Sequence, residues 1–517
     1  MELSRRTLLG NSAVLATMAM LGLRPDRALS AENGVLKIAT YNDINTLDPG
    51  YMALDIEGSV LFATMPSLAR LKLDERGTWG WVPSEYVEKV EQIDDLHIDF
   101  TLKKGLMWSD DAGELTAEDV KFTFERYPKT DWSTRWETLD HVEVKDKYNG
   151  TIVLKKPFVA IWMMSIGFDS GFILPKSKVE AMPDQKYTTP LPAQLGPYLL
   201  AEWTPAEKIV LKANPNWQGT KPVFQEVHYI HVGDEKAAEL ALQANEVDAA
   251  YLRPETAAAF ATSPYPDTDL VTIKGLWYQW MGMNTDYPKL KDVRVRKAIQ
   301  RAVDVEAVIA ASYSGTSPAG TGIVPPGILG HREKAGYSHN PGEAKALLAE
   351  AGVTDLSLKL RYDASSSVDA TTAQVIQANL ADVGITIELV PTESGPYWEL
   401  GQESKGDQWK DHQLIIMAFR TGPEPADAMQ WFTKSQIGIW NWERWSDPEF
   451  EDLWQKALSE KDVEKRGAMY VRMQDIMENT GAYVWITFPA SFIGCRKGIT
   501  AGYFPGGGWL PQEFKTA

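Results

Sequence analysis

The sequence predicts an α/β fold divided into at least two lobes, and three observations lead to this prediction. The chain has 517 residues, more than a single hydrophobic core usually organises. Its content of 44% hydrophobic and 24% charged residues is typical of a folded globular protein. From residue 34 onward, strand-like and helix-like patterns alternate, and no internal repeat, low-complexity tract or long linker interrupts them.

Residues 1–31 differ from the rest of the chain and predict an export signal. Arg5 and Arg6 precede a modest apolar run over residues 8–23, and small residues up to Ala31 offer a cleavage site. The arginine pair resembles a twin-arginine signal. A short membrane anchor is the alternative, which the polar residues inside this short run disfavour. We therefore expect an exported, soluble, periplasmic protein.

The cysteine content and the net charge indicate the compartment of the protein and exclude some classes of binding partner. The only cysteine is Cys495, which excludes an internal disulfide and lipid attachment at the signal junction. This usage favours a periplasmic protein of a Gram-negative cell without a lipid anchor. The formal charge is −18, and no cluster of Lys or Arg offsets it, which argues against binding to nucleic acid or anionic lipid.

Helix signals occur early in the chain and in its middle. Thr116 caps a predicted helix that buries Val120 and Phe124 on one face, and Asp292 precedes another helix with an apolar stripe. Near the end, Asp447 opens a third helix of this kind. These stripes predict core packing rather than ligand contact.

The strongest α/β pattern begins at Asn340, which caps a helix that Gly352 ends. A strand with alternating apolar residues follows over residues 356–362. A second unit repeats the plan, with a helix ended by Gly384 and a strand over residues 385–389. Helices and strands that succeed one another in this way predict an α/β lobe.

Reaction motifs are missing from the sequence. It contains no Gly-x-Ser-x-Gly, His-Glu-x-x-His, phosphate-loop or Cys-x-x-Cys motif. His228 and His231 are close in sequence, but a spacing of three in a strand points them to opposite faces. Cys495 lies in an apolar strand, where a thiol is usually inert. We therefore predict a binding protein rather than an enzyme, with no metal and no cofactor.

Several short segments occur in a characteristic order and spacing, although none of them is specific alone. They are Leu47-Asp48-Pro49, Phe100 to Gly105, Leu115 to Val120, Gly196-Pro197-Tyr198, Asn214 to Trp217, Asn284-Thr285, Asp292 to Ile299, the capped helix at Asn340 and Ser446 to Phe450. Through these segments the chain, from about residue 36 to its end, resembles the extracellular solute-binding proteins of family 5, the peptide, opine and nickel class.

The resemblance implies a two-lobed periplasmic-binding-protein clamshell of type II, of the large class with an extra subdomain, in which helices flank mixed sheets. Lobe I would comprise residues 32–275 and 488–517, with the extra subdomain at about 60–190, and lobe II residues 276–487. A monomer would enclose its ligand between the lobes by a shift of population towards the closed form. Permease subunits of an ABC transporter in the inner membrane would be its partners.

Peptide binders of the family hold the peptide's amino terminus with an aspartate in a Trp-x-x-Asp-like segment. The matching segment here, residues 419–425, has Gly422 at the acidic position, and Glu424 lies two residues further on. Peptide binding is therefore the alternative rather than the first prediction. Arg420 and Thr421 also belong to this segment, and Arg420 suits a carboxylate or phosphate of the ligand if it faces the cleft. A surface or lobe-packing arginine is the other interpretation.

Aromatic residues are the second clue to the ligand. Of the 19 tryptophans, several lie where the family builds its cleft. Flat rings beside amide and guanidinium donors suit a sugar-like or sugar-conjugated solute such as an opine. On a strand only one of the neighbours Trp277 and Tyr278 can face the cleft. The predicted ligand-binding residues are Tyr41, Asn42, Trp277, Tyr278, Trp398, Arg420, Thr421, Glu424, Trp440 and Asn441, the first two from the opposite lobe by the family pattern.

We therefore predict the periplasmic substrate-binding component of an ABC importer that captures a small polar solute, opine-like or sugar-conjugate-like and of anionic character. A secreted hydrolase and a chaperone or signalling protein built on the same clamshell are the other classes. The sequence leaves the solute itself open among opines, peptides, sugar conjugates and nickel chelates.

Overall fold

The computed structural model of the chain describes residues 34–516 except 41, 53, 75–78 and 505–506. The predicted signal segment, residues 1–31, lies outside the described residues. Within the described part of the chain, no helix is long and apolar enough to cross a lipid bilayer.

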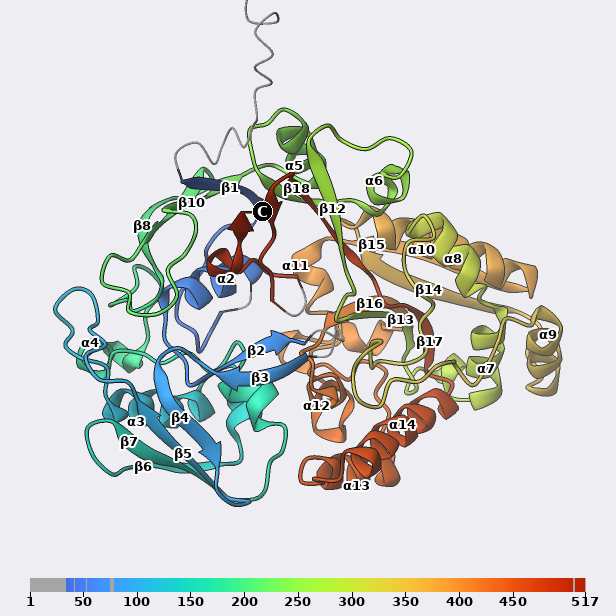
Figure 1. Cartoon of the computed structure of the whole chain (residues 1–517). Helices are drawn as coiled ribbons and strands as arrows, with labels where there is room; N and C mark the ends of the chain where they lie inside the picture. Colours follow the sequence, from blue (N-terminus) through green and yellow to red (C-terminus); the bar gives the residue numbers. More distant parts are fainter. Residues whose placement is uncertain (1–33, 41, 53, 75–78, 505–506, 517) are drawn as a thin grey trace, which may run out of the picture.

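A seven-stranded sheet forms the first part of the fold, which we call lobe I (Figure 1). Its order is β12-β18-β11-β1-β10-β9-β8, and β1 pairs in parallel with β10 and β11. The strands are β1 (Val35–Thr40), β8 (Tyr198–Thr204), β9 (Lys208–Ala213), β10 (Glu226–His231), β11 (Ala249–Leu252), β12 (Thr268–Ile273) and β18 (Ser491–Arg496). The helices of this part are α2 (Asp55–Thr64), α5 (Glu235–Gln243) and α6 (Pro254–Ala259).

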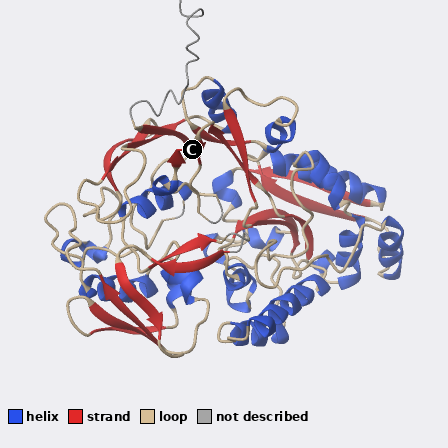
Figure 2. Ribbon diagram, viewed as in Figure 1, coloured by secondary structure: helices blue, strands red, loops and turns tan. Residues whose placement is uncertain are grey.

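A five-stranded mixed sheet forms lobe II, in the order β15-β14-β16-β13-β17. Its strands are β13 (Trp277–Met283), β14 (Leu356–Asp363), β15 (Ile385–Thr392), β16 (Leu414–Arg420) and β17 (Tyr483–Thr487). The helices beside it are α7 (Val293–Ala302), α8 (Val305–Ser312), α9 (Pro341–Glu350) and α10 (Ser367–Asp382) (Figure 2). Apolar residues of these helices and of the sheet share one buried core.

A smaller antiparallel sheet, β4-β5-β7-β6, forms a subdomain next to lobe I, with α3 packed on β6. Its elements are β4 (Val87–Gln92), β5 (His97–Leu102), β6 (Leu139–Val144), β7 (Asn149–Leu154) and α3 (Ala117–Arg126), and the hairpin of β2 (Ala69–Leu73) and β3 (Trp79–Pro83) precedes it. The remaining elements are α4 (Lys176–Val179), α11 (Ser394–Tyr397), α12 (Pro425–Met429), α13 (Pro448–Ala457), α14 (Val463–Asn479), β19 (Ile499–Thr500) and β20 (Lys515–Thr516).

The local signals in the sequence are confirmed where they were strongest. The side chain of Asn340 accepts a hydrogen bond from the backbone N–H of Glu343 at 3.0 Å and so caps α9. Gly352 and Gly384 follow the ends of α9 and α10 with φ of 69° and 86°, the left-handed conformation that favours glycine. The two predicted strands appear as β14 and β15, which pair in parallel.

The chain passes twice between the two large sheets. The first passage joins β12 to β13 through residues 274–276, and the second joins β17 to β18 through residues 488–490. The two passages touch, because a Cβ atom at Gly275 would lie 1.9 Å from the carbonyl oxygen of Pro489. Only glycine permits this close approach.

Candidate functional site

A cavity of about 440 Å³ opens between the two lobes, and residues of both lobes line it. Lobe I contributes the segment after β1 and the start of α2. Lobe II contributes the beginning of β13, the end of β16 and the segments around 398 and 431–440. The lining residues are Asn42, Leu54, Asp55, Trp277, Trp398, Ala418, Phe419, Arg420, Trp431 and Trp440. We call this space the interlobe cavity.

Strand pairing brings two of the lining residues together. Trp277, the first residue of β13, is paired with Arg420, the last residue of β16. Alternation along β13 turns Tyr278 and Trp280 to the opposite face, where both are buried, and the indole N–H of Trp280 donates to Glu443 at 2.7 Å. The structure therefore places Trp277 rather than Tyr278 at the cavity.

Aromatic rings form most of the cavity wall on the lobe II side. The ring of Trp440 stands at steep angles to three others: 66° to Trp398, 76° to Trp431 and 86° to Phe419, with centroid separations of 6.4, 6.4 and 5.9 Å. The indole nitrogens of Trp398, Trp431 and Trp440 make no hydrogen bond within the described part of the chain. They are therefore available to a bound solute as donors.

Arg420 connects the lobes at the edge of the cavity. Its guanidinium binds Asp55 of α2 at 2.5 Å and Asp169 of the subdomain side at 3.3 Å. The side chain of Asp169 is 2% exposed, whereas that of Asp55 is 42% exposed. Burial raises the pKa of Asp169, and the charges of Arg420 and Arg135 oppose this effect. Asp169 therefore depends on Arg420 for compensation of its charge.

Some of the predicted contacts lie at the interlobe cavity and others lie elsewhere. Asn42, Trp277, Trp398, Arg420 and Trp440 line the cavity. Tyr41 lies outside the described residues. Tyr278, Thr421, Glu424 and Asn441 are buried and do not line the cavity.

Two of the buried residues have polar groups that the fold itself uses. The carboxylate of Glu424 accepts from the hydroxyl of Tyr470 at 3.2 Å and lies 3.5 Å from the guanidinium of Arg466. The amide nitrogen of Asn441 donates to backbone carbonyl oxygens, among them that of Trp445 at 2.9 Å. These contacts stabilise lobe II, and we leave both residues out of the proposed binding set.

Sequence reasoning missed Asp169 as the partner of Arg420, and it missed five lining residues, Leu54, Asp55, Ala418, Phe419 and Trp431. Asp55 occupies the first position of α2, where an acidic residue is ordinary because it favours the helix dipole. Its place opposite Arg420, 365 positions along the chain, follows only from the tertiary fold.

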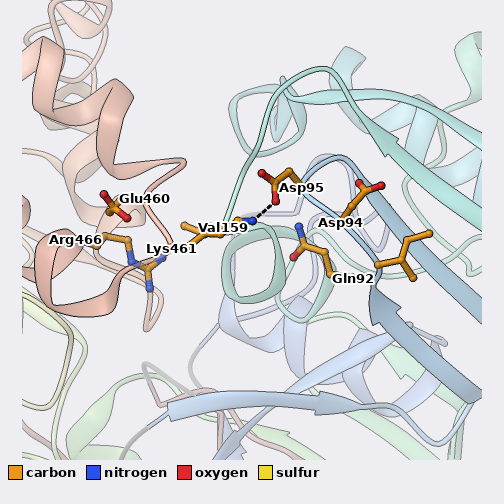
Figure 3. Close-up of a pocket in the computed structure, with 8 residues that line it drawn as sticks. Gln92, Asp94, Asp95, Val159, Glu460, Lys461 and Arg466 are labelled. Atoms are coloured by element: carbon orange, nitrogen blue, oxygen red, sulfur yellow. Dashed lines mark hydrogen bonds and ion pairs between the residues drawn. The ribbon is translucent and has the colours of Figure 1, made fainter.

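A second cavity, of about 470 Å³, lies between the subdomain loop after β4 and the segment that joins α13 to α14 (Figure 3). Its lining is mostly charged, and Lys461 reaches across it to form an ion pair with Asp95. Nearby, the backbone N–H of Val159 donates to the carbonyl oxygen of Leu458 at 2.9 Å. This cavity has no aromatic lining residue among those the structure describes, and the ion pair of Lys461 and Asp95 joins its two sides.

Metal coordination finds no support in the described residues, since among them no three His, Cys, Asp or Glu side chains could together hold an ion. His412 is buried, and burial lowers its pKa to about 3. It is therefore a neutral core residue at ordinary pH.

Comparison with known proteins gives one family match and many relatives. A family model described as "Bacterial extracellular solute-binding proteins, family 5 Middle" matches residues 82–441. The dipeptide-binding protein of Escherichia coli is 27% identical over 479 residues, which cover 84% of this chain and 86% of that protein.

Two solved structures share the fold over most of the chain. AppA of Bacillus subtilis in complex with a nonapeptide has a TM-score of 0.78 at 22% identity, with 94% of this chain and 99% of that chain covered. AgaA of A. tumefaciens R10 in complex with agropinic acid has a TM-score of 0.76 at 24% identity, with coverage of 93% and 99%. These likenesses confirm the predicted α/β clamshell fold.

Proposed function

The chain belongs to family 5 of the bacterial extracellular solute-binding proteins, the substrate-binding components of ABC importers, and on this basis we propose that it captures a small polar solute in the interlobe cavity. The solute has a flat or ring-shaped body, as in an opine or a sugar conjugate. The residues that hold it are Asn42, Asp55, Trp277, Trp398, Phe419, Trp431 and Trp440.

One observation carries the proposal: both lobes contribute to a single cavity that tryptophan rings wall on one side. A volume of about 440 Å³ lies within the usual range for small-molecule sites. Sugar rings and other flat bodies pack well on aromatic faces, while indole N–H groups, the Asn42 amide and the Asp55 carboxylate offer hydrogen bonds to hydroxyl groups. The lining residues thus match a solute with one flat face and a polar edge.

The anionic character expected from Arg420 finds less support in the geometry. Arg420 already binds Asp55 and Asp169, so a solute carboxylate would have to displace a protein carboxylate. Displacing Asp169 would leave a buried charge without its partner, which is strongly unfavourable. We therefore assign Arg420 a structural role: it joins the lobes through its ion pairs and forms part of the cavity wall.

Peptide binding is the second candidate. The identity to the E. coli dipeptide-binding protein favours it, and the half-exposed carboxylate of Asp55 could take an α-amino group. The position expected to carry the acidic residue of a peptide binder is Gly422, and Glu424 is engaged with Tyr470 and Arg466. These two features rank a peptide below an opine or sugar conjugate.

Binding would couple to closure of the lobes. A solute that touches both sides of the interlobe cavity binds the closed form better, and this difference in affinity shifts the population. The permease subunits of the importer would then recognise the closed monomer. Solute capture requires no chemical change of the solute.

A ligand screen tests the proposal. We expect an opine or sugar conjugate to raise the melting temperature and quench tryptophan fluorescence, since a ligand at 100 times its Kd adds about 2.7 kcal/mol to the stability. Trp277→Ala should abolish the response, and Trp409→Ala, outside the cavity, should preserve it. A larger response to dipeptides would establish the second candidate, and conversion of the solute, followed by mass spectrometry, would reject a pure binding function.

A further inference from the structure

The interlobe cavity combines a box of aromatic rings with a local excess of negative charge. From this combination we propose that the solute presents a positively charged group, an ammonium, alkylated ammonium or guanidinium, to the rings of Trp398, Phe419, Trp431 and Trp440. The inference rests on the proposed function and names the class of solute that the cavity takes.

The shape of the aromatic wall supports a cation. Rings that stand at steep angles to one another offer several negative faces to one point, and a cation within about 6 Å of each ring centroid is attracted by all of them. The ring of Trp440 stands at such steep angles to the rings of Trp398, Trp431 and Phe419. The corners between these rings are therefore suited to a compact cationic group.

The rings are held in place by a layer of buried residues behind them. Trp442, 1% exposed, stacks behind Trp440 at 6.0 Å and 14°, and its indole N–H donates to the carbonyl oxygen of Ile439 at 2.7 Å. The ring of the buried Tyr397 meets Trp398 edge to face at 5.1 Å. A wall fixed in this way needs little reorganisation when a solute enters, which favours affinity.

The charges at the cavity favour a cation over an anion. Arg420 is the only basic lining residue among those the structure describes, and two carboxylates, Asp55 and Asp169, neutralise it and leave an excess of one negative charge. The neighbouring ion pair of Arg135 and Asp427 adds no net charge. A cation entering the cavity therefore meets aromatic faces and the half-exposed carboxylate of Asp55.

Three probes of nearly equal shape test the inference: choline, its neutral carbon isostere 3,3-dimethylbutan-1-ol, and the anion 3,3-dimethylbutanoate. Titrations followed by tryptophan fluorescence should show choline binding about tenfold more tightly than the alcohol, and the anion binding more weakly still. Equal affinity for choline and the alcohol, tighter binding of the anion, or no response to choline would overturn the inference.

Two matched variants test whether Asp55 contributes to the preference for a cation. Asp55→Asn should weaken choline binding about fivefold more than it weakens binding of the alcohol, because only choline loses an opposite charge, whereas Asp355→Asn, an exposed aspartate in lobe II, should change neither. Loss of choline and alcohol binding together in Asp55→Asn would mean a damaged cavity and would count against the assignment of Asp55. If choline fails while a neutral solute of the ligand screen binds in a Trp277-dependent manner, solute capture stands and the cationic preference falls.

Discussion

The guanidinium of Arg135 binds the carboxylate of Asp427 at 3.0 Å and joins the subdomain to α12 of lobe II. Both side chains are buried, 6% and 3% exposed. The same carboxylate accepts a hydrogen bond from the backbone N–H of Gly422 at 2.6 Å. The ion pair therefore ties the contact between the lobes to the segment that carries Arg420.

We predict that Arg135→Ala lowers the free energy of unfolding by about 3–5 kcal/mol, because removing the guanidinium leaves the buried Asp427 carboxylate without its ion-pair partner. Urea denaturation measures the change. Arg472, which pairs with Glu449 at the surface, is the matched control, and Arg472→Ala should cost less than about 1 kcal/mol. Equal losses of unfolding free energy in the two variants would show that the buried ion pair stabilises the protein no more than the surface ion pair does.

The pair of Arg420 and Asp169 leads to a second prediction. Arg420→Ala should destabilise the protein by about 3 kcal/mol, and Asp169→Asn in that background should restore part of the loss, since the uncompensated charge is then gone. Thermal unfolding of the two single variants and the double variant forms the required cycle. Strictly additive losses would contradict the coupling.

Trp440 should dominate the affinity for the solute. We expect Trp440→Ala to weaken binding by about 2 kcal/mol, or about thirtyfold, because the ring contacts three other rings of the cavity wall. Isothermal titration calorimetry with the solute identified by the screen measures this loss. Trp409→Ala, with a ring that covers Arg444 instead, should bind as the wild type does, and a comparable loss there would point to a general loosening of lobe II.

The stability of lobe II should depend on pH through a buried acid. Burial, with the charge of Asp363, raises the pKa of Asp369 to about 7 from an unfolded value near 3.8. Between these two pKa values the folded state binds more protons than the unfolded state. The contribution of Asp369 to the free energy of unfolding therefore falls as pH rises from about 4 to about 7, by up to about 1.4 kcal/mol per pH unit.

The variant Asp369→Asn isolates this contribution. Its stability relative to the wild type should increase between pH 5 and pH 7.5 in urea melts, because the asparagine does not ionise. Asp355→Asn should keep a constant difference over the same range. A constant difference in Asp369→Asn would mean that the acid titrates in its ordinary range.

Cys495 should report unfolding of lobe I. The residue is fully buried in β18, and burial raises the pKa of its thiol to about 12. We expect a thiol reagent at pH 8 to label the native protein only at the rate at which the sheet opens, and to label it rapidly in urea. Rapid labelling under native conditions would contradict the burial of this strand.

Periodic patterns in the sequence predicted local elements well. The helices capped by Asn340 and Asp292 and the strands β14 and β15 appear where their apolar periodicity and capping residues indicated. These signals depend on neighbours within a few residues, so a single sequence contains them. The order of strands in the sheets depends on contacts between distant segments, and the family resemblance supplied the expected two-lobed arrangement.

The candidate site shows the same division between local and distant contacts. Strand alternation predicted that only one of Trp277 and Tyr278 faces the cleft, and Trp277 is the one that does. Asn441 was predicted as a contact because tryptophans surround it, yet its amide donates to backbone carbonyl oxygens in the core. The role of Asp55 depends on a partner hundreds of residues away, and no pattern near Asp55 indicates it.

The position of β18 has a consequence for synthesis of the chain. This strand lies between β11 and β12, although all of lobe II separates it from them in sequence. While the ribosome is still elongating, the sheet of lobe I therefore exposes two unpaired strand edges, which are templates for aggregation. Lobe I can complete its sheet only after lobe II has been synthesised, because β11 and β12 lack their common partner strand until residues 491–496 emerge.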